Sequence, residues 1–117
     1  MNIKTTLKQA ALLLTGTLAL ASSALAQDIL LEGVSIQQTV ACHNNNLVIN
    51  GASNSIRATG HCNRIEINGA SVKVEADSVS HVRIVGASSS VLYKTSPNKN
   101  GKATVSISGA SSYARKI

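Results

Sequence analysis

Residues 47–53 read LVINGAS, and nearly the same stretch returns as IEINGAS at 65–71, VRIVGAS at 82–88 and VSISGAS at 105–111. A related stretch, ILLEGVS, stands at 29–35. Each copy alternates apolar and polar residues, as a strand with one buried face does, and then reaches a glycine turn. The five glycines are 18, 18, 17 and 23 residues apart. A strand and a tight turn that recur with this period indicate the stacked coils of a β-solenoid.

A second apolar segment follows the turns, beginning at Ile56, Val74 and Val91, so each coil is expected to carry two strands. We therefore predict an all-β, single-domain parallel β-solenoid of about five coils of roughly 18 residues. The alternation places these side chains in the interior: Leu47, Ile49, Ile56, Ile65, Ile67, Val74, Val82, Ile84, Val91, Val105 and Ile107. An antiparallel sandwich or barrel is the alternative, because it also joins short strands by regular turns.

Stacking in register also predicts neighbours on the outer surface. Equivalent residues of adjacent coils lie about 4.8 Å apart, the usual spacing of paired strands. Glu66 is then expected to meet Arg83, and Arg57 is expected to meet Glu75. Opposite charges at both positions agree with an in-register stack.

Residues 1–26 have the features of a secretory signal peptide. Lys4 and Lys8 supply a basic start, residues 10–20 are apolar, and small residues end the segment at Ala26. We expect cleavage before Gln27, which leaves a solenoid domain at 27–117 that is exported to the periplasm or secreted. An uncleaved membrane anchor is the alternative, although the apolar stretch is short for a bilayer span. The mature chain itself is expected to contain no transmembrane span.

Charge is distributed unevenly along the chain. The formal net charge of +6 includes two lysines of the signal segment, and all five acidic residues precede residue 78, whereas six basic residues follow it. The last five of these form a basic pole: Lys94, Lys99, Lys102, Arg115 and Lys116. For an exported protein, the expected partners of this pole are anionic components of the cell envelope rather than nucleic acid. Alternatively, the charge serves only solubility.

The two cysteines are predicted to form a disulfide. Residues 36–42 align without a gap on residues 56–62, which gives Cys42 and Cys62 equivalent places in adjacent coils. Stacking would bring them within bridging distance, and export provides an oxidising environment.

A metal site is the alternative use of these residues. The two thiols with His43 and His61 make a set of zinc-ligand types, and His61 with His81 would suit copper or nickel. On a strand, however, adjacent side chains such as Cys42 and His43 point to opposite faces. We expect no metal and no cofactor.

Catalytic residues are not evident in the sequence. Glu75 and Asp77 share a strand face and resemble an acid pair, but Arg57 is expected to neutralise Glu75. No serine stands with a histidine and an acid in a spacing typical of a triad. We therefore expect a protein without enzymatic activity. The turn serines could instead form a regular hydroxyl array for a polymer or ice, although turn geometry alone accounts for small residues there: Ser53, Ser71, Ser88 and Ser111, with Asn50 and Asn68 beside them.

The order of these motifs resembles an exported bacterial family, domain of unknown function 3060. The resemblance lies in Cys42, the LVINGAS turn, the Gly-x-Cys at 60–62, the IEINGAS turn and the Val-x-Tyr at 91–93, and it extends over residues 28–114. It implies a small all-β repeat domain with no established activity. We expect a non-catalytic interaction or structural module of the envelope or the extracellular space. A weak hydrolase or lyase acting on a polymer, and a surface protein that assembles through its unpaired terminal strands, are the alternatives.

Overall fold

The computed structural model describes residues 26–117 and contains eight β-strands in that part of the chain. The strands are β1 (Asp28–Val34), β2 (Gln37–Ala41), β3 (Asn46–Ala52), β4 (Ser55–Ala70), β5 (Lys73–Ala87), β6 (Ser90–Thr95), β7 (Thr104–Ser108) and β8 (Tyr113–Lys116). The signal peptide expected at residues 1–26 falls, apart from its last residue, outside the described residues.

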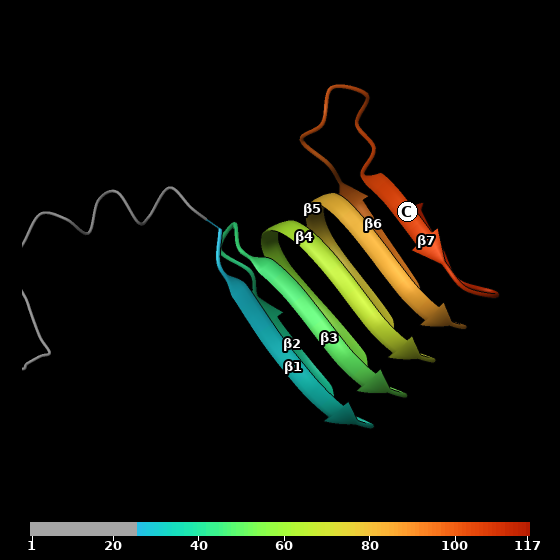
Figure 1. Cartoon of the computed structure of the whole chain (residues 1–117). Helices are drawn as coiled ribbons and strands as arrows, with labels where there is room; N and C mark the ends of the chain where they lie inside the picture. Colours follow the sequence, from blue (N-terminus) through green and yellow to red (C-terminus); the bar gives the residue numbers. More distant parts are fainter. Residues whose placement is uncertain (1–25) are drawn as a thin grey trace, which may run out of the picture.

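The strands wind into a β-solenoid with two faces (Figure 1). The first face consists of β1, β3, the second halves of β4 and β5, and β7. The second face consists of β2, the first halves of β4 and β5, β6 and β8. All these pairings are parallel, which supports the solenoid and excludes the antiparallel alternative. The solenoid has about four turns, so the expected number of five coils was slightly too high.

The Gly-Ala-Ser turns form a corner between the two faces. Gly69 has a φ of +158°, and a Cβ atom there would overlap the carbonyl oxygen of Gly51 in the preceding coil. Ser71 then takes a left-handed φ of +56°, and its N–H donates to the carbonyl oxygen of Ala87, 2.9 Å away in the next coil. Glycine is therefore required by the close approach of successive coils as well as by the backbone conformation.

Two side chains just beyond the corner bind the backbone of the coil before them. Asn54 is almost fully buried; its Oδ1 accepts from the N–H of Ile36 at 2.8 Å, and its Nδ2 donates to the carbonyl oxygen of Gly33 at 3.1 Å. The Ser89 hydroxyl accepts from the N–H of Val72 at 3.2 Å. Backbone groups at the inner side of the corner are thereby satisfied away from water.

The core consists of aliphatic columns that run from coil to coil. Leu47, Ile65 and Val82 are successive members of one such column, and all three are buried. The predicted interior is correct for the coils that have neighbours on both sides, but it is wrong for Val105 and Ile107, which are 41% and 38% exposed. Their strand, β7, pairs only with β5 within residues 26–117, so no further coil covers them there.

Candidate functional site

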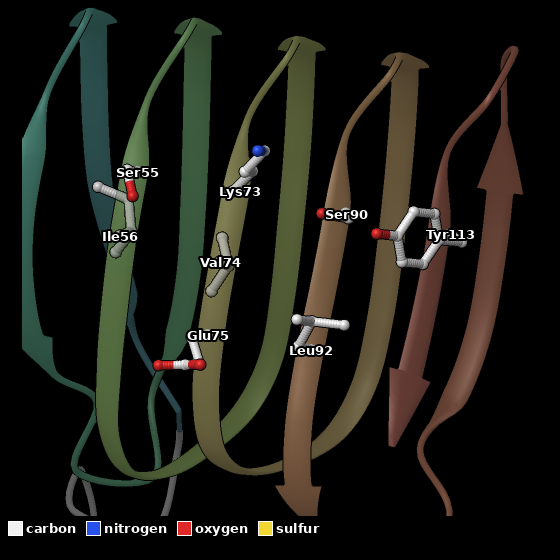
Figure 2. Close-up of a pocket in the computed structure, with 8 residues that line it drawn as sticks. All are labelled: Ser55, Ile56, Lys73, Val74, Glu75, Ser90, Leu92 and Tyr113. Atoms are coloured by element: carbon white, nitrogen blue, oxygen red, sulfur yellow. The ribbon is translucent and has the colours of Figure 1, made fainter. Parts of the chain in front are cut away.

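A shallow trough lies on the second face (Figure 2). Its volume is about 320 Å³, and Tyr113 of β8, which is 47% exposed, stands at its end. Parallel register places Ser90 beside Tyr113 on one side and beside Lys73 on the other. The short side chain of Ser90 thus leaves a gap between two long ones. The trough is lined by Ser55, Ile56, Lys73, Val74, Glu75, Ser90, Leu92 and Tyr113.

A second hollow of about 510 Å³ lies on the same face toward β2, and it shares Ser55, Ile56 and Glu75 with the first. Together they give the second face an open groove that crosses the coils. This groove was not predicted from the sequence. The signal was present in the outward positions of the second strands, where serines at 55 and 90 alternate with longer side chains along the stack.

The expected pairing of Arg57 with Glu75 is confirmed. One guanidinium nitrogen of Arg57 lies 2.8 Å from Glu75 Oε1, and the other lies 3.5 Å from Asp77 Oδ1. Lys94 Nζ lies 3.8 Å from the same Asp77 oxygen, and Asp77 also accepts from the N–H of Gly60 at 3.2 Å. The two carboxylates that resembled a catalytic acid pair are therefore engaged by two cations and a backbone donor.

The expected neighbours Glu66 and Arg83 do occupy the same register position in β4 and β5. The Glu66 carboxylate, however, turns along its own strand. It lies 3.6 Å from Arg64 Nε and accepts from Asn68 Nδ2 at 3.2 Å. The predicted register is correct, while the ion pair that the structure forms is a different one. Asn68 also donates to Asn50 in the preceding coil at 2.9 Å, which ties this polar column together.

Cys42 and Cys62 form the predicted disulfide, with their Cα atoms 5.0 Å apart. The alignment that led to this prediction was nevertheless wrong. Residues of β2 pair with residues 18 positions later, so Gln38 rather than Ile36 lies beside Ile56. The bond crosses diagonally between coils, since the N–H of Cys42 bonds the carbonyl oxygen of Thr59. His43 and the next residue turn the chain here with left-handed φ values of +50° and +66°.

The histidines do not come together as a metal site. In the described part of the chain, no three His, Cys, Asp or Glu side chains form a group that could hold a metal ion. His61 has Ser78 as its register partner, whereas His81 lies beside Arg64 and Thr104. The disulfide occupies both thiols of the candidate zinc set.

His61 instead lies between two serine hydroxyls of the neighbouring coil. Its Nδ1 is 2.8 Å from Ser78 Oγ, and its Nε2 is 3.1 Å from Ser80 Oγ. This cluster was not predicted from the sequence, because the two serines are 17 and 19 positions from His61 and meet it only through stacking. A nucleophile activated by histidine requires a third group that orients the ring, commonly a carboxylate. Here a second serine takes that position, and within residues 26–117 no carboxylate hydrogen-bonds His61.

The basic pole is brought together at the C-terminal end of the solenoid. Lys99 and Lys102 lie in the loop between β6 and β7, which projects from the stack in Figure 1, and Lys116 at the end of β8 places its Nζ beside Gly101 of that loop. The guanidinium of Arg115 lies 5.5 Å from the centre of the Tyr113 ring. Among the five pole residues, only Lys94 has an acidic partner within the described residues.

The comparisons with known proteins add a family and nothing more specific. Residues 26–117 contain no helix that is long and apolar enough to cross a membrane. No curated protein and no solved structure matches the chain significantly. One family model matches residues 49–111, which is more than half of the chain, and its description reads "Protein of unknown function (DUF3060)". The matched segment runs from β3 through the Gly-Ala-Ser corners to the last one, and the chain therefore belongs to the DUF3060 family.

Proposed function

We propose that this protein is an exported, non-catalytic β-solenoid that acts as an interaction module of the cell envelope or the extracellular space. It binds anionic envelope components through its basic pole. The observation that carries this proposal is the pole itself, where four exposed cations without acidic partners in the described chain gather at one end: Lys99, Lys102, Arg115 and Lys116.

The geometry of the pole supports binding to an extended anionic surface rather than to a single small anion. The cations stand on a projecting loop and on an outer strand, and they do not converge on a cavity. A basic side chain near an anionic lipid surface contributes about 1 kcal/mol, and salt screens the attraction. Four such contacts predict weak, reversible binding that decreases steeply as the salt concentration rises.

Binding to vesicles tests the proposal. The protein should sediment with vesicles that contain phosphatidylglycerol or lipopolysaccharide, but not with purely zwitterionic vesicles. Replacing Lys99 and Lys102 together by glutamine should weaken the binding. The matched control replaces Lys73 and Arg83 by glutamine, because these cations are also exposed but lie outside the pole. Equal losses in the two double variants would show that net charge, and not the pole, attracts the surface.

The absence of catalysis is part of the proposal and has its own test. The carboxylates of Glu75 and Asp77 are engaged by Arg57, and a serine stands beside His61 where a triad would have an orienting acid. Both observations support a binding role. The purified protein should not degrade envelope polysaccharides. Turnover that is lost on Glu75→Ala, Asp77→Ala or His61→Ala would overturn this proposal in favour of a hydrolase or lyase.

Export is tested separately. The basic start and apolar stretch of residues 1–26 support a cleaved signal peptide. Mass spectrometry of the protein recovered outside the cytoplasm should find Gln27 at its N-terminus. Retention of the first residues would indicate an anchor instead.

A further inference from the structure

The two ends of the solenoid both present open strand edges. At the C-terminal end, β7 pairs within residues 26–117 only with β5, and Val105 and Ile107 remain partly exposed. At the N-terminal end, β1 pairs within residues 26–117 only with β3. An unpaired edge with apolar neighbours is a template for another strand.

On the first face, the terminal strands β1 and β7 match each other in sequence pattern and in register. Ile29 begins the column that passes through each coil to Val105, and Leu31 begins the column that ends at Ile107. If a second copy continued the stack, Val105 of one copy would contact Ile29 of the next, and Ile107 would contact Leu31. Gly109 would then extend the close-packed glycine corner onto Gly33 of the next copy.

The polar columns also continue across such a junction. Within the chain, Asn46 Nδ2 donates to Asp28 Oδ1 at 2.9 Å, and Asn50 Nδ2 donates to Glu32 Oε2 at 3.4 Å. These two carboxylates have no coil on their other side within the described residues. The continued register places the hydroxyls of Thr104 and Ser108 there as donors.

Charge selects the orientation of the copies. The N-terminal coil, residues 28–45, contains two acids and no Lys or Arg, whereas residues 94–117 contain five basic residues and no acid. A head-to-tail junction brings opposite charges together, and a junction between two like ends brings like charges together. Electrostatic complementarity of this kind favours one orientation over the other.

We propose that the protein assembles head to tail, with β7 of one copy adding in parallel register to β1 of the next. The second face contributes less to the junction, because the continued register sets Lys116 over Val40 and Ala114 over Gln38 of the next copy. The Lys116 amine lies beside Gly101 in the loop and not over the core. The association is therefore reversible and dependent on concentration. The same basic end of the chain takes part in the proposed binding to anionic surfaces, so assembly is tested in the absence of any such surface.

Cross-linking tests the register directly. Ser106 and Leu30 both point outward and would face each other across the junction at about 4.8 Å, within the range of Cα separations that a disulfide accepts. A Ser106→Cys protein mixed with a Leu30→Cys protein should form a mixed dimer under mild oxidation. The matched control mixes Ser106→Cys with Val34→Cys, which lies four residues, or about 13 Å, further along the strand. Equal cross-linking in both mixtures would overturn the proposal. So would a product in which the Ser106→Cys protein is cross-linked only to itself.

Analytical sedimentation tests the contact in the protein without cysteine substitutions, purified as its host produces it. The apparent mass should increase with protein concentration. Ile107→Lys places a charge on the junction and should weaken association about tenfold or more, whereas Ser106→Lys, which points outward, should have a small effect. Circular dichroism should show that both variants fold, because both residues are already exposed in the single chain. A monomer at all concentrations, or equal effects of the two variants, would contradict the proposed junction.

Discussion

Replacing Gly69 by alanine is expected to destabilise the solenoid by about 4 kcal/mol, and the reason lies in the stacking of the corner. A Cβ atom at Gly69 would overlap the carbonyl oxygen of Gly51, which is backbone and cannot rotate away. The two coils must separate locally by more than about 1 Å to restore van der Waals contact. This weakens the ladder around the corner, where residues 68–70 pair with residues 50–52.

The magnitude follows from two contributions. Hydrogen bonds of the ladder contribute about 1 kcal/mol each, and about three of them lie at this corner. The backbone at φ +158° adds about 1 kcal/mol of strain for a residue with a Cβ atom. Because small domains have unfolding free energies of about 5 to 15 kcal/mol, this loss is a large fraction of the total stability.

Gly60 provides the matched control. Its φ is +72°, but a Cβ atom there would meet no other atom within 4 Å. Gly60→Ala should therefore cost only the strain of the left-handed backbone, about 1 kcal/mol. Urea unfolding followed by circular dichroism, with the disulfide intact, measures both variants. Recovery of folded Gly60→Ala but not of Gly69→Ala would support the same reasoning. A Gly69→Ala protein that is as stable as Gly60→Ala would refute the close approach of the coils.

Three further predictions concern the contacts within the coils. Replacing Cys42 and Cys62 together by serine should lower the unfolding free energy by about 3 kcal/mol, and a thiol assay on the unreduced protein should detect no free thiol. Asn54→Ala should cost about 2 kcal/mol in urea unfolding because it leaves two backbone groups without partners; a neutral result would contradict its corner role. Arg57→Ala should cost less than about 1 kcal/mol in the same assay, since its ion pairs are exposed to solvent, and a larger loss would show that these pairs stabilise the fold.

The first face could be predicted from the sequence to the residue because its corner repeats. The close packing at Gly51, Gly69 and Gly86 permits only one register, and the chain marks each of these places with the same tripeptide. The opposite side of the solenoid has no such marker. There the gap-free alignment of residues 36–42 on 56–62 was two residues out of register, although the disulfide that it suggested does form.

The contacts that could not be predicted depend on conditions beyond strand alternation. Alternation correctly assigned Val105 to the inward side, but burial also requires a coil on each side of the strand. Register correctly placed Glu66 beside Arg83, but a long side chain has several rotamers and Glu66 points toward Arg64. The meeting of His61 with two serines required both the register and the irregularity that follows Ala58 in the pairing of β4 with β5.

We expect the binding sites for other molecules to lie where the repeat is interrupted. A residue that repeats in every coil contacts its equivalents above and below, as the corner glycines and the aliphatic columns do, so its side chain is already engaged within the chain. The 23-residue interval between Gly86 and Gly109 contains the loop with Lys99 and Lys102, which has no equivalent in the other coils. The terminal strands β1 and β7 differ in another way, because they carry the repeated sequence but lack a neighbouring strand on one side within residues 26–117. The loop therefore favours a foreign anionic partner, whereas the strand ends favour a second copy of the same chain.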